Sequence, residues 1–181
     1  KTFGPSAVDA AVAAGLDDVG ENYAQEAAAK LTEITTTPTV HFIGRLQRNK
    51  VRLLAPHVDV WQTVDRPELA TEIAKRAPGA KVMIQVDISG EENKGGGGPD
   101  TTEDLVMHAT DAGLEVIGLM GVALLAEPQA ARPGFSVLRR LVDRLDLDEC
   151  SMGMSADLEI AVDEGATMVR IGRDLFGERL G

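Results

Sequence analysis

The fold of this chain is decided by a short design that is clearest in the stretch EGATMVRIG at residues 164–172. The pattern predicts a helix that ends at a glycine, then a brief β-rich run that a second glycine closes. The same design occurs as AGLDDVG at residues 14–20 and as AGLEVIG at residues 112–118. The first glycine suits the left-handed residue that ends a helix, and the run after it suits a short, buried parallel strand.

The rest of the chain continues this alternation. We expect seven strands, over residues 18–21, 39–44, 59–64, 81–88, 114–120, 149–153 and 167–171. Eight helices are expected over residues 5–14, 23–34, 47–54, 67–75, 101–111, 133–145 and 156–164, with a short last one from residue 174. Alternation of this kind predicts a parallel sheet with right-handed crossovers.

The number of strands favours a barrel. The first helix has no strand in front of it, and one more strand, ending at about Lys1, would complete eight β/α units. A complete (β/α)8 barrel typically has about 250 residues, whereas this chain has 181. We therefore predict an α/β protein with the (β/α)8 TIM-barrel fold whose first strand is missing from this chain: one N-terminally incomplete domain over residues 1–181. The alternative is an open doubly wound sheet, although no Gly-x-Gly-x-x-Gly turn supports the dinucleotide-binding version.

Charge and cysteine content narrow the functional classes. The net charge is −11, which disfavours binding to nucleic acid or to anionic lipid. The chain has one cysteine, Cys150, so an internal disulfide is impossible and a reducing cytoplasm is favoured. We expect Cys150 to be a small buried side chain and His41 to be a hydrogen-bonded core histidine rather than a base. No spacing typical of a metal site is found, and Gly95–Gly98 is expected to form a flexible loop.

The most informative strand ends are the last two. Ser155 follows a strand and is well placed as the N-cap of the next helix, with Asp157 in its first turn. Gly172 follows the last strand and precedes a short helix, so the backbone there can approach a ligand closely. Barrels frequently hold a phosphate between the loops after strands seven and eight and a short extra helix. These two ends therefore predict a phosphate site.

A lysine at the end of the first strand would project into the same cavity. The default role of Lys1 is a solvated surface charge, but a lysine buried beside a phosphate site can form a Schiff base with an aldehyde. This combination suggests pyridoxal 5′-phosphate (PLP) as the cofactor. It also suggests an aldolase, and the spacing alone does not choose between them.

Several motifs, in order along nearly the whole chain, resemble those of the pyridoxal phosphate homeostasis proteins, the YggS/PROSC family. The matching stretches are GENYAQE at residues 20–26, HFIGRLQRNK at 41–50, QVDISGE at 85–91, GLMG at 118–121, SMGMSAD at 151–157, RIG at 170–172 and FGER at 176–179. The resemblance implies a single-domain barrel like the N-terminal domain of alanine racemase, which is PLP fold type III, with PLP bound covalently.

The resemblance also implies roles for individual residues. Lys1 corresponds to the lysine that forms the Schiff base, Asn22 to a pocket residue, and Arg170 to the arginine that faces the pyridine nitrogen. The residues that correspond to the phosphate cup are Ser155, Gly172 and Arg173, with Ser151 as a further candidate. The family usually has threonine at the position of Arg173 and asparagine at that of Asp87, so this chain departs from the pattern at both positions.

An arginine beside the pyridine nitrogen disfavours protonation of that nitrogen and makes the ring a poorer electron sink. A racemase would need a second base on the opposite face of the ring, and Tyr23 is the single tyrosine of the chain. We therefore expect a PLP-binding protein of vitamin B6 homeostasis that lacks efficient turnover. The alternatives are a PLP-dependent amino-acid racemase-like enzyme and a Schiff-base aldolase, which would need an acid beside the lysine.

The resemblance further implies PLP as the ligand and PLP-dependent apoenzymes as candidate partners. We expect a cytoplasmic monomer or weak dimer that binds no metal, nucleic acid or membrane.

Overall fold

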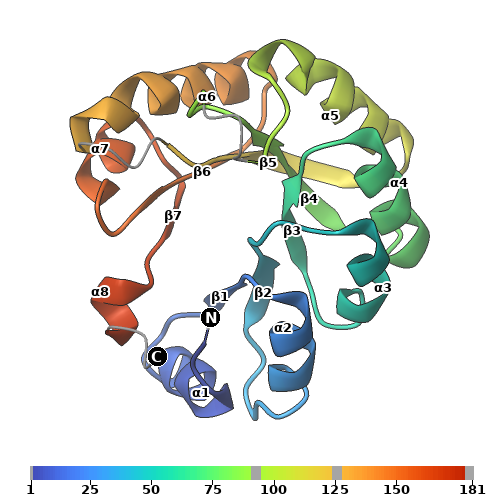
Figure 1. Cartoon of the computed structure of the whole chain (residues 1–181), viewed down its shortest axis with the longest axis vertical. Helices are drawn as coiled ribbons and strands as arrows, with labels where there is room; N and C mark the ends of the chain where they lie inside the picture. The colour runs from blue at the N-terminus through green and yellow to red at the C-terminus, as the bar shows by residue number, and fades with distance from the viewer. Residues whose placement is uncertain (1, 91–94, 124–127, 178–181) are drawn as a thin grey trace.

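The computed structural model describes residues 2–90, 95–123 and 128–177. Its seven parallel strands form one sheet in which every strand pairs with its neighbour in the sequence. The strands are β1 (Asp18–Glu21), β2 (Thr39–Phe42), β3 (Val60–Val64), β4 (Lys81–Val86), β5 (Glu115–Gly121), β6 (Glu149–Met154) and β7 (Met168–Arg170). A doubly wound sheet would reverse its strand order at a switch point. The order here never reverses, and the sheet curves into a nearly closed barrel (Figure 1). The barrel prediction is confirmed and the doubly wound alternative is wrong.

Helices cover the outside of this sheet (Figure 1). They are α1 (Pro5–Ala13), α2 (Ala24–Lys30), α3 (Val51–Leu54), α4 (Pro67–Arg76), α5 (Thr102–Asp111), α6 (Arg132–Arg144), α7 (Leu158–Asp163) and α8 (Arg173–Phe176), with 3-10 turns η1 (Arg48–Lys50), η2 (Pro99–Thr101) and η3 (Pro128–Ala131). The glycines of the repeated design, Gly15, Gly113 and Gly165, follow the turns that end α1, α5 and α7, with φ of 86°, 85° and 85°. They occupy the left-handed conformation that the sequence predicted at helix ends.

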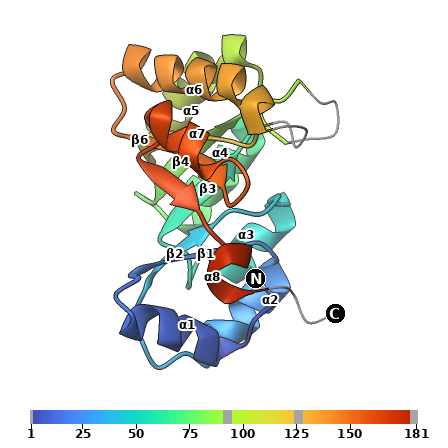
Figure 2. The same cartoon turned by 90° about the vertical axis from the view of Figure 1, so that its left-hand side faces the viewer.

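The sheet has two edge strands, β1 and β7. Among the described residues no strand lies between β1 and β7 to close the barrel. The expected strand before Lys1 lies outside this sequence and stays a prediction. Figures 1 and 2 both place α8, which follows β7, beside the beginning of the chain.

The main core lies between the sheet and the helices. Apolar side chains of the strands and helices meet there, and the largest fully buried ones include Trp61, Phe42 and Phe135. Cys150 belongs to this core and is buried, as expected. Burial raises the pKa of its thiol to about 11. The thiol is therefore un-ionised at neutral pH, which confirms the expected role as a small buried side chain.

An ion-pair cluster ties β1 to α2 within this layer. The Nζ of Lys30 lies 2.7 Å from Oε1 of Glu21 and 2.9 Å from Oε1 of Glu26. The side chains of Lys30 and Glu21 are only 5% and 3% exposed. Burial opposes the charge, yet the hydrogen bonds that Lys30 donates to the two carboxylates raise its pKa overall. The second oxygen of Glu21, Oε2, has no partner in the part of the chain that the structure describes.

Two helices are shorter than the sequence predicted. Helix α2 ends at Lys30, and the threonine-rich run after it turns away because Asp9 of α1 accepts hydrogen bonds from Thr35 and Thr36. Helix α7 begins at Leu158. Asp157 is its N-cap, with its side chain turned back to accept a 2.6 Å hydrogen bond from the Met154 amide. The prediction of Ser155 as the N-cap is therefore wrong.

The glycine run Gly95–Gly98 is also different from the flexible loop that was expected. Gly97 forms a parallel bridge with Val86 at the end of β4. Its amide donates to the Gln85 carbonyl, and its own carbonyl accepts from the Asp87 amide. The side chain of Gln85 donates a 2.7 Å hydrogen bond to the Gly95 carbonyl. Three hydrogen bonds thus hold the segment against the end of β4, and the absence of glycine side chains permits this close approach.

Candidate functional site

The candidate site is built around Arg170, the last residue of β7. Its Nη1 donates a 2.7 Å hydrogen bond to the Ser151 hydroxyl of β6. Its Nη2 donates a 2.8 Å hydrogen bond to the carbonyl of Gly121, the last residue of β5. A Cβ at Gly121 would lie 2.7 Å from Cδ1 of Ile88, so a larger residue there would have to displace the end of that side chain. Neighbouring strands therefore fix the guanidinium from two sides.

The Arg170 guanidinium lies deep in the protein, and the residue as a whole is half-buried. Burial lowers the pKa of Arg170 to about 10, although the negative charge of Asp157 opposes this change. A pKa near 10 still leaves the group protonated at pH 7. Arg170 is then a donor of hydrogen bonds with no capacity to accept one.

The residues predicted to hold a phosphate lie just beyond Arg170. The register pairs Met154 with Arg170, so the segments that follow them are neighbours. Ser155 lies half-buried in the turn after β6, and no hydrogen bond of its side chain is found among the described residues. Gly172 is exposed, and a Cβ there would meet nothing within 4 Å. Arg173, the first residue of α8, is exposed as well.

Ser151 is placed differently from these residues. It is fully buried inside the barrel. Its hydroxyl accepts from Arg170 and donates a 2.7 Å hydrogen bond to Oε1 of Gln62 on β3. Both capacities of the hydroxyl are therefore used by protein groups, and Ser151 supports Arg170 from within the barrel.

Lys1 lies outside the described residues, but the residues that follow it are held beside this site. The rings of Phe3 and Phe176 are 5.4 Å apart between centroids, which joins the start of the chain to α8. On the other side, the Thr2 amide donates a 2.5 Å hydrogen bond to Oε1 of Glu26. Residues 2 and 3 therefore lie between α2 and α8, the two helices that follow the edge strands.

Asn22 follows β1, at the far edge of the sheet from Arg170. Its backbone carbonyl packs directly on Gly44, and a Cβ at Gly44 would overlap it. Asn22 lines a cleft of about 910 Å³ over the ends of β1, β2 and β3, together with Tyr23, Gln25, Arg45, Gln47, Lys50, Asp65 and Arg66. Tyr23 is 48% exposed there. The structure thus brings the segments of Ser155, Gly172 and Arg173 together, whereas Asn22 follows the other edge strand of the sheet.

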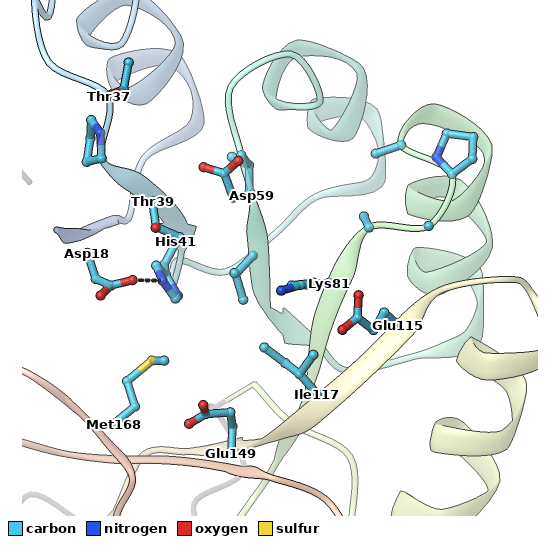
Figure 3. Close-up of a pocket in the computed structure, with 17 residues that line it drawn as sticks. Asp18, Thr37, Thr39, His41, Asp59, Lys81, Glu115, Ile117, Glu149 and Met168 are labelled. Carbon is cyan, nitrogen blue, oxygen red and sulfur yellow. Dashed lines mark hydrogen bonds and ion pairs between the residues drawn. The ribbon is translucent and has the colours of Figure 1, made fainter.

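A second cavity, of about 850 Å³, opens at the opposite end of the barrel. It is shown in Figure 3, where Asp18, His41, Lys81, Glu115, Glu149 and Met168 surround one opening. These residues come from the beginnings of the strands. In TIM-barrel enzymes that end serves stability, and the active site lies at the other end. No group of three or more histidine, cysteine or acidic side chains suited to a metal occurs in the described part of the chain.

Sequence reasoning missed Gln62 and understated His41. His41 is buried and hydrogen-bonded, as expected, yet its partner on the neighbouring strand β3, Gln62, was not singled out. The available signal is the strand VWQTV at residues 60–64, all of which is buried. Gln62 stands on the face opposite Trp61, where only a polar partner inside the barrel satisfies it.

The comparisons with known proteins bear on this geometry. The family described as alanine racemase, N-terminal domain, matches residues 3–180. The pyridoxal phosphate homeostasis protein of Aquifex aeolicus is 41% identical in an alignment of 192 positions that covers 99% of this chain and 84% of that protein. The chain therefore belongs to the family of the pyridoxal phosphate homeostasis proteins. The Pseudomonas aeruginosa member is 42% identical over 190 residues, covering 99% of this chain and 82% of that one.

Solved structures agree with this assignment. PipY of Synechococcus elongatus, solved with PLP bound, is 32% identical to this family member, with a TM-score of 0.86 that covers 98% of this chain and 89% of PipY. Lysine decarboxylase from Selenomonas ruminantium is 20% identical, with a TM-score of 0.72 over 94% of this chain and 54% of the enzyme. That second likeness shows a shared fold and nothing more. The relatives with high identity are named for homeostasis and not for a reaction.

No helix of the described residues is long and apolar enough to cross a membrane.

Proposed function

We propose that this chain binds PLP at the C-terminal end of its barrel and serves vitamin B6 homeostasis in the cytoplasm without efficient turnover. In this proposal Lys1 holds PLP as a Schiff base and Arg170 faces the pyridine nitrogen. Ser155, Gly172 and Arg173 receive the phosphate, Asn22 lines the pocket, and PLP-dependent apoenzymes receive the cofactor. Ser151 acts through Arg170.

The observation that carries the proposal is the doubly anchored guanidinium of Arg170. A buried cation fixed on Ser151 and on the Gly121 carbonyl, in a residue that is itself only half-buried, is suited to meeting a ligand atom that accepts a hydrogen bond. The pyridine nitrogen of PLP is such an atom. PipY, of the same fold and 32% identical, has been solved with PLP bound.

The residues around Arg170 also fit the phosphate. Gly172 leaves open space where any other residue would place a Cβ. Ser155 has a hydroxyl that the helix cap does not use, because Asp157 takes the capping position. Arg173 adds an exposed cation at the position where the family usually has a hydroxyl. The contact between Phe3 and Phe176 brings the segment after Lys1 to α8, which begins at Arg173.

PLP supplies an aldehyde for the lysine and, when its ring nitrogen is protonated, an electron sink for carbanions. The protein favours the first of these uses and weakens the second. With a pKa of about 10, Arg170 is protonated at pH 7 and can only donate, so the ring nitrogen in front of it must stay an acceptor. The single tyrosine, Tyr23, stands half-exposed in the cleft beside Asn22. This arrangement favours retention of PLP over racemase chemistry.

The test is to add PLP to the purified chain, reduce with borohydride and map the adduct by tandem mass spectrometry. We expect one adduct, on the Nζ of Lys1; fragmentation must separate it from an adduct on the α-amino group of the same residue. Lys1→Ala should remove the adduct. Lys81→Ala is the matched control, because Lys81 lines the cavity at the opposite end of the barrel, and should leave the adduct unchanged.

An adduct that survives Lys1→Ala would contradict the assignment of the lysine. Turnover of D- or L-alanine that Lys1→Ala abolishes would favour the racemase-like alternative. Changing Arg170 to Glu should shift the absorption spectrum of bound PLP, and an unchanged spectrum would contradict the role of Arg170.

A further inference from the structure

One chain of hydrogen bonds crosses the barrel interior from end to end. It begins at Arg170 on β7, which donates to Ser151 on β6, and Ser151 donates to Gln62 on β3. The Nε2 of Gln62 lies 2.8 Å from Nδ1 of His41 on β2. The Nε2 of His41 lies 2.9 Å from Oδ1 of Asp18 on β1. We call these five residues the interior chain. It links the candidate site to the cavity of Figure 3.

The direction of the interior chain follows from its first member. A guanidinium can only donate, so the Ser151 hydroxyl must accept from Arg170 and use its own proton for Gln62. Gln62 then accepts with Oε1 and donates with Nε2. His41 must accept at Nδ1, which leaves its proton on Nε2 to be donated to Asp18. Every proton in the chain thus points from the arginine cation to the aspartate carboxylate.

The central residues of the interior chain are buried, so water does not replace a hydrogen-bond partner that is lost. Gln62 is 1% exposed, His41 4% and Ser151 fully buried. Nε2 of Gln62 also lies 3.0 Å from the Met168 sulfur, a weak acceptor. If the Gln62 amide were lost, the Ser151 proton would lose its acceptor in a place that water does not reach. The hydroxyl would then be free to rotate away from the orientation that accepts from Arg170.

We propose that Gln62 is a positioning residue for Arg170: through Ser151 it fixes the orientation in which the guanidinium meets the ring nitrogen of PLP. The last clause rests on the proposed function, whereas the fixing of Arg170 can be observed without any ligand. Gln62 acts from across the barrel and touches neither Arg170 nor the residues expected to hold the phosphate.

Two variants on one strand test the proposal. Gln62→Met keeps the length of the side chain but removes the acceptor for Ser151. Thr63→Val is the matched control, since Thr63 is the next residue of β3, is also buried, and has a hydroxyl with no partner among the described residues. Both changes replace one buried polar side chain by an apolar one of similar size. Only the first one breaks the interior chain.

The first readout uses the chain without PLP. Hydrogen exchange of the Arg170 Nη–H groups is followed by nitrogen-15 NMR, and their signals are assigned by their loss in Arg170→Lys. We expect exchange about two- to tenfold faster in Gln62→Met than in the wild type, which is the effect of losing one hydrogen bond. Thr63→Val should match the wild type. The second readout is PLP titration, in which Gln62→Met should bind about two- to tenfold more weakly and with a shifted absorption maximum.

The outcomes separate the two proposals. If the wild type takes up no PLP, the proposed function fails, and the exchange measurement still decides whether Gln62 positions Arg170. If Gln62→Met leaves both readouts unchanged, or if Thr63→Val changes them equally, the positioning role is overturned. A wild-type Arg170 that exchanges as fast as exposed Arg52 would overturn it too, and this comparison does not depend on the folding of either β3 variant.

Discussion

Replacing Lys30 by methionine would leave Glu21 with a buried carboxylate and no cation beside it. Methionine keeps the length and apolar stem of the lysine, so the packing between β1 and α2 is largely retained. Lys30 is the partner of Oε1 of Glu21 at 2.7 Å, and Oε2 has no partner among the described residues. The variant therefore isolates the electrostatic role of the ammonium group.

The loss of stability depends on whether the buried carboxylate stays charged or takes up a proton. Removing one partner of a buried ion pair costs about 3–5 kcal/mol. Glu21 can limit this cost by taking up a proton. From a reference pKa of about 4.3, protonation costs about 3.7 kcal/mol at pH 7 and about 1 kcal/mol at pH 5. A buried carboxyl without a cation beside it is tolerated best in its neutral form, so the variant should lose less stability at low pH than at pH 7. We expect Lys30→Met to be destabilised by about 3–4 kcal/mol at pH 7 and about 1 kcal/mol at pH 5.

Urea unfolding of the wild type and Lys30→Met at pH 5 and pH 7 measures the predicted loss of stability directly. Trp61 is the single tryptophan and is fully buried, so its fluorescence reports on the core. Lys75→Met, at an exposed lysine of α4, is the matched control and should change the free energy of unfolding by less than about 0.5 kcal/mol. In the double variant Lys30→Met with Glu21→Leu, most of the lost stability should return, because no charge is left buried. A loss of equal size at pH 5 and pH 7 would refute the reasoning.

Three further predictions concern single positions. Cys150 should resist thiol reagents at pH 8 in the folded protein, because burial raises the pKa of its thiol from 9.0 to about 11. For the same reason the free energy of unfolding should fall by roughly 2–3 kcal/mol between pH 9 and pH 11, relative to Cys150→Val. Urea titrations of the two proteins would measure this difference. Gly153→Ala should cost about 3 kcal/mol in urea unfolding, since Gly153 has φ of 93° and a Cβ there would overlap the Ala161 side chain; a change below 1 kcal/mol would contradict this. Gly44→Ala should lower the melting temperature strongly, because its Cβ would overlap the Asn22 carbonyl, whereas Gly4→Ala, with nothing within 4 Å, should not.

Local sequence signals were enough to predict the sheet. The strand that begins at Asp18 has the bounds the sequence predicted, and the other strands differ by a few residues at their ends. Strands of a barrel are buried on both faces, and three of them appear as short β-rich runs between glycines, at residues 14–20, 112–118 and 164–172. The helix ends that were missed depend on side chains elsewhere: Asp9 holds the segment after α2, and Asp157 turns back to Met154. Such contacts leave no periodic pattern in the sequence.

The site was predictable in part for the same reason. Arg170, Gly172 and Ser155 follow strands, and parallel strands end at one edge, so their proximity follows from the strand order. Gln62 was missed because its partner Ser151 is 89 residues away in the sequence. A polar residue in a buried strand indicates that a partner exists, but no local pattern identifies it.

The interior chain changes how the two ends of this barrel should be interpreted. In most TIM barrels layers of branched apolar side chains fill the interior and separate the end that gives stability from the end that carries function. Here Gln62, His41 and Ser151 occupy part of that space, and each is hydrogen-bonded to the next. The orientation of Arg170 at one end therefore depends on His41 at the other, because reversing any one member would leave its neighbour with two donors or two acceptors facing each other. A substitution in the cavity beside Asp18, far from the proposed cofactor, should consequently be tested for PLP binding as well as for stability.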